Sequence, residues 1–321
     1  MRILVSGGLG FVGINLVQHL ASFADVEVIA ADVLEPDSAV REFLQPVSKR
    51  VSFYRLDVSD GTAYQRLAKK CGATHVVHAA AITPDPEYER DYSVRVVEVN
   101  LIGSLNALAL AYQLPQVERV LLISSSGVYG APPAGIKRQS ERGRLNLDSL
   151  YAVTKISAEM VADRYGQLSS KGFAAVRLAS VYGPMERPSG SRQHMSHFQR
   201  LRAALREGRR VRVWGADLAR DWVYAWDVAE AIHSLLRATD WNHTVYNVGA
   251  GRAYPFRQVV NAFAAHGLQM EWVDDPFQAE IAIRPEGVRA ALDIRRLKKD
   301  TGFTPHYDLD TGVEAYLQAP S

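Results

Sequence analysis

The sequence predicts an α/β fold in which a doubly wound parallel sheet is followed by a smaller C-terminal lobe. Three observations predict it. Short apolar segments alternate with helical patterns over the first half of the chain, a glycine-rich loop follows the first apolar segment, and the alternation breaks up after Gly183 and Pro184. The expected strands of the sheet cover residues 3–5, 26–31, 51–56, 75–79, 120–124 and 174–178.

The first strand leads directly into a loop that contains Gly7, Gly10 and Gly13, and then into an amphipathic helix. One glycine permits a tight turn, one lets the backbone approach a pyrophosphate, and one lets helix and strand pack closely. The helix N-terminus offers free N–H groups and a positive dipole end to phosphates. This order predicts a Rossmann-type dinucleotide-binding domain, with Phe11 and Val12 of the loop also at the cofactor.

The second expected strand ends in Asp32, which follows Gly13 by 19 residues. A carboxylate at this position accepts hydrogen bonds from a ribose 2′-hydroxyl. It would also repel a 2′-phosphate, and no arginine follows until Arg41. The sequence therefore predicts NAD rather than NADP as the cofactor.

Small and polar residues follow the third and fourth strands. Asp57, with Val58 beside it, is placed to contact the adenine amino group, although an aspartate there could equally cap a helix. Three small residues at the end of the fourth strand would let the backbone approach the cofactor: Ala79, Ala80 and Ala81. Asn100 lies in an apolar helix, where its amide needs a buried partner, so we place it in a polar network at the cofactor.

Tyr151 and Lys155 are one helical turn apart, so both side chains lie on one face of a helix. An ammonium beside a phenol favours the phenolate, and such a tyrosine can exchange a proton with a hydroxyl or a carbonyl. The spacing also arises by chance, but the dinucleotide loop gives it a chemical use. Ser124, Ser125 and Ser126 end the fifth strand, where their hydroxyls could orient a substrate oxygen or form a turn.

Bulk composition excludes several classes of function. Of 321 residues 47% are apolar and 22% charged, and the net charge of +2 gives no reason to expect nucleic acid or a membrane as a partner. The single cysteine, Cys71, excludes an intrachain disulfide and a cysteine-only zinc site, and we expect no metal. We find no signal peptide and no apolar run of the roughly 18 residues that span a membrane, so a cytoplasmic protein is expected.

The second half of the chain is expected to form most of a substrate-binding lobe. We place a dinucleotide-binding domain at residues 1–179 and the lobe at residues 180–321, with part of the chain returning to the first sheet. The expected helices cover 198–207, 227–237 and 256–266, and the expected strands cover 210–214 and 244–248. Such a lobe would cover the carboxyl edge of the sheet, where open α/β folds bind ligands.

Together these residues resemble the extended short-chain dehydrogenase/reductase superfamily, and in particular its NAD-dependent sugar epimerase/dehydratase family. The likeness covers nearly the whole chain and extends beyond the motifs above. Further matching segments are Tyr182-Gly183-Pro184, Arg220-Asp221-Trp222-Val223-Tyr224, Asp227-Val228-Ala229, Tyr246-Asn247-Val248-Gly249 and Gly302-Phe303-Thr304-Pro305.

The resemblance implies roles for individual residues. Tyr151 would be the acid/base, Lys155 would bind the nicotinamide ribose and tune the tyrosine, and Ser125 would be the catalytic hydroxyl. Ser126 would contact the substrate and Tyr182 the cofactor. Members of the family commonly form homodimers through the helices that carry the buried asparagine and the catalytic tyrosine.

The same resemblance bears on the type of reaction. Dehydratases of the family follow the catalytic hydroxyl with an Asp-Glu pair, and the residues at those positions here are Ser126 and Gly127. Without two carboxyl groups, 4,6-dehydration lacks its general acid and base. Epimerisation and net oxidation or reduction remain.

The substrate depends on the second half of the chain. Arg220 and Arg284 match two arginines that hold the diphosphate in nucleotide-sugar enzymes of the family, and arginine suits phosphate because it donates two hydrogen bonds at once. Against this, Ser180 replaces the usual asparagine. Four basic residues could instead clamp the carboxylate of a smaller substrate, or form a solvated loop: Arg187, Arg192, His194 and His197.

Three hypotheses follow. The leading one is a nucleotide-sugar 4-epimerase of UDP-hexose type that works through a keto intermediate. The alternative is an NAD-dependent dehydrogenase of a free sugar, aldonate or uronate. A non-catalytic NAD-binding sensor is the third, which the intact pair of Tyr151 and Lys155 disfavours.

Overall fold

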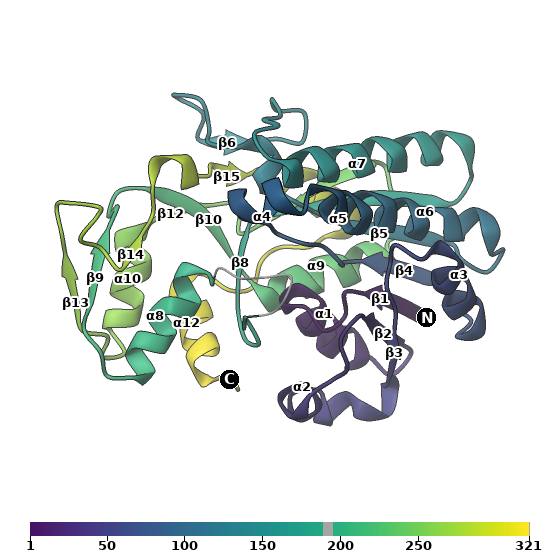
Figure 1. The fold of residues 1–321 in the computed structure, drawn as a ribbon, viewed down its shortest axis with the longest axis horizontal. Helices are drawn as coiled ribbons and strands as arrows, with labels where there is room; N and C mark the ends of the chain where they lie inside the picture. Colours follow the sequence, from purple (N-terminus) through teal and green to yellow (C-terminus); the bar gives the residue numbers. More distant parts are fainter. Residues whose placement is uncertain (189–194, 321) are drawn as a thin grey trace.

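A seven-stranded parallel sheet forms the centre of the protein (Figure 1). The computed structural model describes residues 1–188 and 195–320. The strands lie in the order β11-β7-β5-β4-β1-β2-β3, and neighbouring strands run parallel. They are β1 Arg2–Ser6, β2 Glu27–Asp32, β3 Val51–Arg55, β4 His75–His78, β5 Arg119–Ser125, β7 Gly172–Leu178 and β11 Val245–Val248. All six strands expected in the first half are present.

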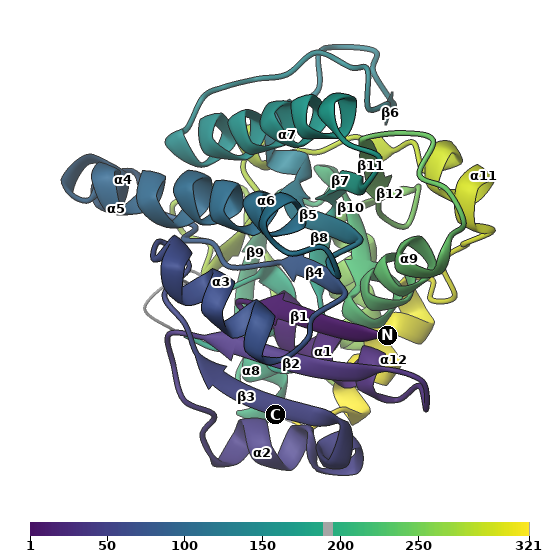
Figure 2. The same cartoon turned by 90° about the vertical axis from the view of Figure 1, so that its right-hand side faces the viewer.

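Helices cover both faces of this sheet, as the two perpendicular views show (Figures 1 and 2). One layer contains α1 Phe11–Ala21, α2 Ser38–Phe43, α9 Ala225–Arg237 and α11 Arg295–Thr301. The other layer contains α3 Gly61–Lys70, α4 Pro86–Asp91, α5 Ser93–Val97, η2 Glu98–Ile102, α6 Gly103–Gln113 and α7 Leu150–Leu168.

The central strands are apolar on both sides because both layers cover them. Along β5, Leu121 and Ile123 join the core under α1 and α9, whereas Val120 and Leu122 join the core under α6 and α7. This alternation follows from the two-residue period of a strand. Each fully buried aliphatic side chain contributes about 1.5–3 kcal/mol relative to exposure, so the two cores hold the strand ends in place.

A second lobe packs beside the sheet and has its own core, which includes Phe198, Leu201, Phe256 and Phe263. Its strands are β8 Ser180–Tyr182, β9 Val211–Trp214, β10 Ala219–Tyr224, β12 Ala253–Pro255, β13 Met270–Trp272 and β14 Ile281–Ala282. Its helices are α8 His197–Arg206, α10 Phe256–Ala264 and α12 Leu309–Gln318. The remaining short elements are β6 Arg138–Gln139, β15 Ala291–Leu292, η1 Gln45–Arg50, η3 Ser126–Tyr129 and η4 Pro285–Gly287.

The chain crosses between the lobes more than once. After β10 it returns to the sheet, where α9 packs on α1 and β11 pairs with β7. Leu292 and Phe303, near the end of the chain, also join the core under α1. A division into residues 1–179 and 180–321 stays a proposal about function, since the first core draws residues from both ranges.

One helical run, Ser93–Gln113, is long and apolar enough by length and composition to cross a membrane. The expectation that no stretch of the chain reaches that length is therefore wrong by this criterion. Half of its apolar window is buried inside the protein, where Val96, Ala107 and Leu108 pack in the core under the sheet. A cytoplasmic location stays a prediction.

Candidate active site

The glycine-rich loop joins β1 to α1 at the carboxyl edge of the sheet. Gly7 has a φ of +72°, and a Cβ there would lie 2.4 Å from the backbone nitrogen of Ala80. A Cβ at Gly13 would lie 2.0 Å from the carbonyl oxygen of Gly7. The loop can be this tight only without side chains. No side chain caps α1 at Gly10, so its first N–H groups suit a pyrophosphate.

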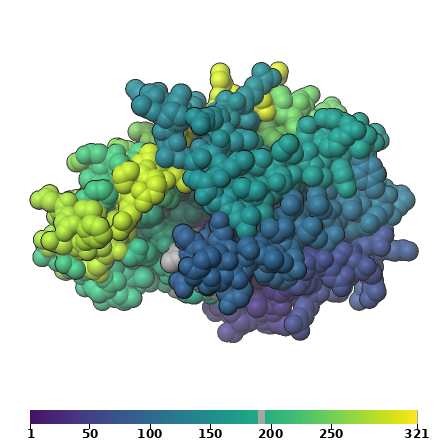
Figure 3. Space-filling model, turned by 45° about the horizontal axis from the view of Figure 1, so that its top comes forward, coloured from purple at the N-terminus to yellow at the C-terminus, as the bar shows by residue number. Residues whose placement is uncertain are grey.

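Two cavities of about 580 Å³ and about 270 Å³ lie at this edge and share wall residues, among them Asp32. The surface is hollowed where the green and yellow atoms of the second lobe meet the blue atoms of the first half (Figure 3). Most of the residues that the sequence placed at the cofactor line one or both cavities: Gly7, Gly10, Phe11, Val12, Gly13, Asp32, Asp57, Val58, Ala79, Ala80, Ala81, Tyr151 and Lys155. The exceptions are Asn100 and Tyr182.

Asp32 ends β2 between the two cavities. One carboxylate oxygen accepts a hydrogen bond from the backbone N–H of Leu9 at 3.1 Å, and the other from that of Leu34 at 3.2 Å. Burial raises the pKa of Asp32, while these N–H groups oppose the rise. A carboxylate held this way keeps acceptor capacity for a ribose hydroxyl, so Asp32 fits the role expected of it.

The smaller cavity is lined by small residues, among them Ala79, Ala80 and Ala81, and by polar ones. Asp57 and Val58 line it together with Tyr88 and Arg95, which the sequence did not single out. Arg95 donates to Asp57 at 2.8 Å, and this ion pair helps to lower the pKa of Asp57. The side chain that caps α3 is Asp60, so the alternative role of Asp57 as a helix cap is wrong. No sequence signal identified Tyr88 or Arg95, because both come from helices rather than strand ends.

Asn100, which was predicted to be a cofactor residue, lines neither cavity. Its side chain is fully buried in η2, where it accepts from the backbone N–H of Ile82 at 2.8 Å and donates to the carbonyl of Ile82 at 2.9 Å. The expectation of a buried partner for this amide is confirmed, but the partner is backbone. Asn100 therefore positions the segment after β4, whose Ala79 and Ala81 line the cavity.

Tyr151, Lys155 and Ser125 line the larger cavity from α7 and the end of β5. The Lys155 ammonium lies 5.6 Å from the centre of the Tyr151 ring and donates to the carbonyl of Ile123 at 2.8 Å. Ser125 accepts a hydrogen bond from the backbone N–H of Gly127 at 3.0 Å. The structure thus brings the expected acid/base, its cation and a hydroxyl to one wall.

A buried ionic network lies behind this wall. Burial lowers the pKa of Lys155 to about 8, against the opposing charge of Glu159 one turn further along α7. Glu159 pairs with Arg177 of β7 at 2.6 Å and accepts a hydrogen bond from the Ser124 hydroxyl. Arg177 also donates to the Tyr129 hydroxyl at 2.8 Å. Sequence reasoning missed this network, although Glu159 repeats the helical spacing of Tyr151 and Lys155.

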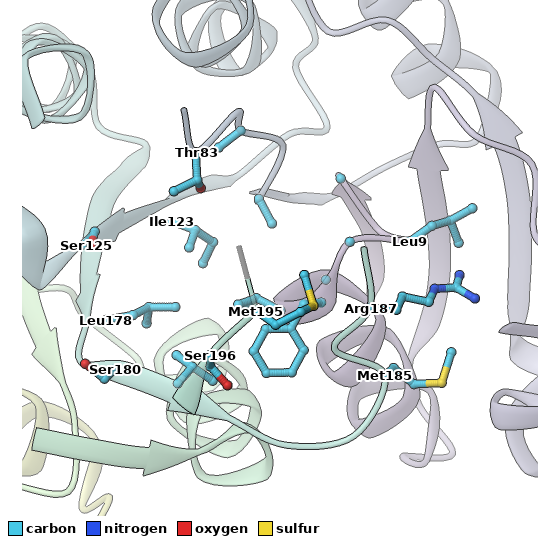
Figure 4. Close-up of a pocket in the computed structure, with 18 of the residues that line it drawn as sticks. Leu9, Thr83, Ile123, Ser125, Leu178, Ser180, Met185, Arg187, Met195 and Ser196 are labelled. Atoms are coloured by element: carbon cyan, nitrogen blue, oxygen red, sulfur yellow. The ribbon is translucent and has the colours of Figure 1, made fainter. Parts of the chain in front are cut away.

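The cavity continues towards the second lobe, as the close-up shows (Figure 4). Ile123, Leu178 and Ser180 line one side, opposite Leu9 and Arg187. Ser180 therefore lies where a substrate residue was expected. The apolar side chains between these polar groups were not predicted, because an apolar residue at a strand end gives the same sequence pattern as a core residue.

Arg220 and Trp222 of β10 line the far end of the larger cavity. The Nε of Arg220 is buried and has no hydrogen-bond partner among the described residues. Burial and the charge of Arg289 lower the pKa of Arg220 to about 10, so the guanidinium stays charged at neutral pH. A Cβ at Gly287 would lie 2.3 Å from Arg220 Nη2, so the glycine makes room for the cation.

Three other predicted contacts lie elsewhere. Arg284 is exposed and lies over the Phe277 ring, and the cation that acts on Arg220 is Arg289. Ser126 is buried in η3 and lines neither cavity. Tyr182 is a core residue of the second lobe. These positions are near the cavity in sequence, but their side chains face other parts of the fold.

The Tyr182 side chain packs among aromatic residues of the second lobe and lines neither cavity. Its ring stacks on Phe198 with centroids 3.9 Å apart. A Cβ at Gly312 would lie 1.9 Å from the Tyr182 hydroxyl, so the phenol points into α12.

Two of the four basic residues proposed as a carboxylate clamp, Arg187 and His197, are described, and both line the larger cavity. Arg187 pairs with Asp37 of the first domain at 2.7 Å. His197 is bonded to the carbonyl of Ala282, and burial lowers its pKa to about 4, so it is neutral near pH 7. Arg192 and His194, also proposed as substrate residues, lie outside the described residues.

Comparison with known proteins identifies the family. The model of the NAD-dependent epimerase/dehydratase family matches residues 3–249. The chain belongs to this family. Its members are enzymes of the extended short-chain dehydrogenase/reductase type with NAD as cofactor.

This member of the epimerase/dehydratase family is similar to named enzymes over almost its whole length. It is 29% identical to UDP-glucose 4-epimerase of Mycolicibacterium smegmatis, over 98% of this chain and 96% of that protein. It is 28% identical to a probable UDP-glucuronate 4-epimerase of Rhizobium meliloti, over 99% and 96%. The structure of Thermus thermophilus UDP-glucose 4-epimerase with NAD matches with a TM-score of 0.80, at 29% identity over all of both chains.

Proposed function

We propose that this protein is a nucleotide-sugar 4-epimerase that acts on a UDP-hexose or UDP-uronate. The cavity has a dinucleotide half, with the glycine loop and Asp32, and a substrate half towards Ser180 and Arg220. Relatives at similar identity are named as 4-epimerases of UDP-glucose and UDP-glucuronate. We assign residues 1–179 mainly to the cofactor and 180–321 mainly to the substrate.

The proposed reaction uses one proton carrier for both faces of the sugar. Tyr151 takes the proton of the C4 hydroxyl, and Ser125 donates a hydrogen bond to the same oxygen. Bound NAD supplies the hydride acceptor and, once reduced, the donor. Lys155 keeps a positive charge beside the phenol and reaches the nicotinamide ribose. The keto sugar then rotates so that its other face is reduced, and Tyr151 returns the proton to the C4 oxygen.

The observation that best supports an anionic substrate is the environment of Arg220. The Nε atom of its half-buried guanidinium is buried and has no hydrogen-bond partner among the described residues, which is costly unless a ligand anion accepts from it. A diphosphate provides two adjacent acceptor groups for the planar fork. The carboxyl-free Ser126 and Gly127 after the catalytic serine support epimerisation over dehydration.

The test is direct conversion. Purified protein is incubated with UDP-glucose, UDP-galactose, UDP-glucuronate or UDP-galacturonate, and products are separated by anion exchange. We expect interconversion of one pair without net NADH formation. No interconversion, together with no rise in melting temperature on addition of UDP, would remove the proposal.

The alternative activity, an NAD-dependent dehydrogenase of a free sugar, aldonate or uronate, can be tested with the same purified protein. It would reduce added NAD over many turnovers, which absorbance at the NADH band measures. Of the four basic residues that motivate it, Arg187 pairs with Asp37 and His197 is bonded to the carbonyl of Ala282, while Arg192 and His194 lie outside the described residues.

We also propose that two copies associate through α6 and α7, which lie side by side in both views (Figures 1 and 2). Val153 and Met160 are seven residues apart on α7 and both are exposed, as are Ile102 and Tyr112 on the neighbouring helical run. Apolar side chains at this spacing form one stripe along a helix. A second copy with the same stripe would cover it.

A further inference from the structure

A cluster of metal-ligating side chains lies between α1 and α9, on residues that the proposed reaction does not use. His19 comes from the last turns of α1, and Glu230 and His233 come from one face of α9. The two helices pack against each other and lie side by side in both ribbon views (Figures 1 and 2). One donor atom from each residue lies within 4.8 Å of the other two.

The distances within the cluster suit a bound ion better than a hydrogen-bonded triad. His19 Nε2 lies 2.8 Å from Glu230 Oε2, whereas His233 Nδ1 lies 3.7 Å from the same oxygen, which is too far for a hydrogen bond. Two ligands about 2.05 Å from a tetrahedral zinc ion lie about 3.3 Å apart. The two observed distances fall on either side of this value, so small side-chain rotations suffice.

The cluster is partly shielded from solvent. The side chain of His233 is 6% exposed and that of Glu230 is 30% exposed. Glu230 also accepts a hydrogen bond from the Ser234 hydroxyl at 3.1 Å. The other charged residues of α9 have partners outside the cluster: Arg237 pairs with Asp25, and Asp227 accepts from the backbone N–H groups of His306 and Tyr307.

His233 is held in place rather than free to turn away. Its ring packs on Phe23 with centroids 3.8 Å apart. Its Nε2 is buried without a hydrogen-bond partner among the described residues. The packing on Phe23 keeps the other ring nitrogen, Nδ1, on the side of Glu230, 3.7 Å from its Oε2.

We propose that His19, Glu230 and His233 bind one zinc ion, with water in the fourth position. Two imidazoles and a carboxylate favour zinc over calcium or magnesium, which prefer oxygen ligands. The Glu-x-x-His spacing places two ligands on one helix face, as in metal sites of helical bundles. This site would correct the sequence-based expectation of no metal.

The ion would link α1 and α9, each of which is next in the chain to a segment of the active site. α1 begins at the glycine loop, and α9 follows β10, which carries Arg220. The ion site itself lies away from the glycine loop, since His19 is in the last turn of α1 and the loop precedes the first turn. Its expected effect is therefore on stability and not on the chemistry.

The experiment uses untagged, chelator-treated full-length protein. Zinc binding is measured by competition with a chromophoric chelator, and cobalt is added separately to record visible absorption bands of tetrahedral coordination. We expect one tight equivalent and a higher melting temperature that EDTA reverses. His19→Gln and Glu230→Gln should each weaken binding by about tenfold or more.

His266→Gln is the matched control, because His266 is exposed at the end of α10 and outside the cluster. Its affinity for zinc should equal that of the unaltered protein. Far-ultraviolet circular dichroism identifies any variant that does not fold, and His19→Gln, at a partly exposed position, is the variant least expected to unfold. Absence of a tight equivalent, or equal affinity in all three variants, would overturn the proposal.

Discussion

Lys155 is a buried cation and Arg220 a half-buried one, and their surroundings give them different tasks. Burial lowers the pKa of Lys155 to about 8 and that of Arg220 to about 10. Glu159 offsets part of the cost of burial for Lys155, whereas the charge that acts on Arg220 is that of a second arginine, Arg289. Lys155 is therefore tuned for a local role beside Tyr151, and Arg220 keeps an uncompensated charge for an incoming anion.

Replacing Tyr151 with phenylalanine removes the proton carrier and leaves the ring. We expect kcat for the UDP-sugar pair to fall by about 10²–10⁴-fold, with melting temperature and NAD binding unchanged. Tyr92→Phe is the control, since Tyr92 is exposed outside the cavity. Full activity in Tyr151→Phe would show that another group moves the proton.

Turnover should fall as pH rises through about 8, because Lys155 loses its charge there. The folded pKa lies below the ordinary value of 10.5, so between these values the unfolded chain holds the extra proton. This group then contributes increasing stability as pH rises through that window, while activity declines. A kcat profile that stays flat to pH 10 would contradict the assignment.

Arg220→Met and Arg284→Met separate the buried cation from the exposed one. Loss of a charged hydrogen-bond donor costs about 1.5–3 kcal/mol, so KM for the UDP-sugar should rise by about 10- to 150-fold in Arg220→Met. Arg284→Met should leave KM within about twofold. Equal effects would indicate that Arg284 reaches the substrate during turnover.

At the scale of elements, α7 determines how the catalytic groups meet. Lys155 bonds to the carbonyl of Ile123, and Glu159 bonds to the Ser124 hydroxyl, so two consecutive residues of β5 are fastened to one helix. Ser125, the next residue, is thereby held opposite Tyr151. β10 is fastened in a similar way, since Asp221 accepts backbone hydrogen bonds from Ala250, Gly251 and Leu292.

Glu159→Gln should therefore affect more than stability. Leaving Arg177 buried without its partner is expected to cost about 3–5 kcal/mol in urea unfolding. The pKa of Lys155 should fall further, which moves the alkaline decline in kcat to lower pH. Glu42→Gln on exposed α2 is the control and should change neither. An unchanged pH profile of kcat in a folded Glu159→Gln protein would show that Glu159 does not influence the pKa of Lys155.

At the scale of the whole molecule, the cleft between the lobes and the surface of α6 and α7 are distinct features. The cleft lies at the carboxyl edge of the sheet, whereas the two helices cover a face of it. Met160 is 69% exposed on that surface. Association through the helices would thus leave the cleft accessible.

Light scattering after size exclusion should give the mass of a dimer. Met160→Glu places a charge in the proposed contact and should shift the mass towards a monomer. Phe277→Glu is the control, because Phe277 is 84% exposed in the second lobe and away from α6 and α7. A monomeric mass for the unaltered protein would refute this contact.

The residues found from sequence were those that a local pattern reveals. The glycines, Asp32, Tyr151 and Lys155 belong to short segments in which strand, loop and helix follow one another, so their spacing placed them, whereas the family resemblance singled out Ser125. Arg95 and Arg289 were missed, and Tyr182 and Arg284 line neither cavity, because the positions of all four depend on packing between segments that are distant in the chain. A motif match placed Asn100 near the cofactor, but the backbone of Ile82 is its partner.

The sequence by itself determined the alternating architecture, the dinucleotide loop and the acid/base pair, because strand and helix periods and glycine spacing act over a few residues. Only the tertiary structure decided which arginine enters the cleft. Arg220 and Arg284 are equally basic in the sequence, but β10 places Arg220 in the cavity wall beside Trp222 with its Nε buried, while Arg284 lies exposed over Phe277. Burial removes solvent from a charge, and burial is a property of the folded chain.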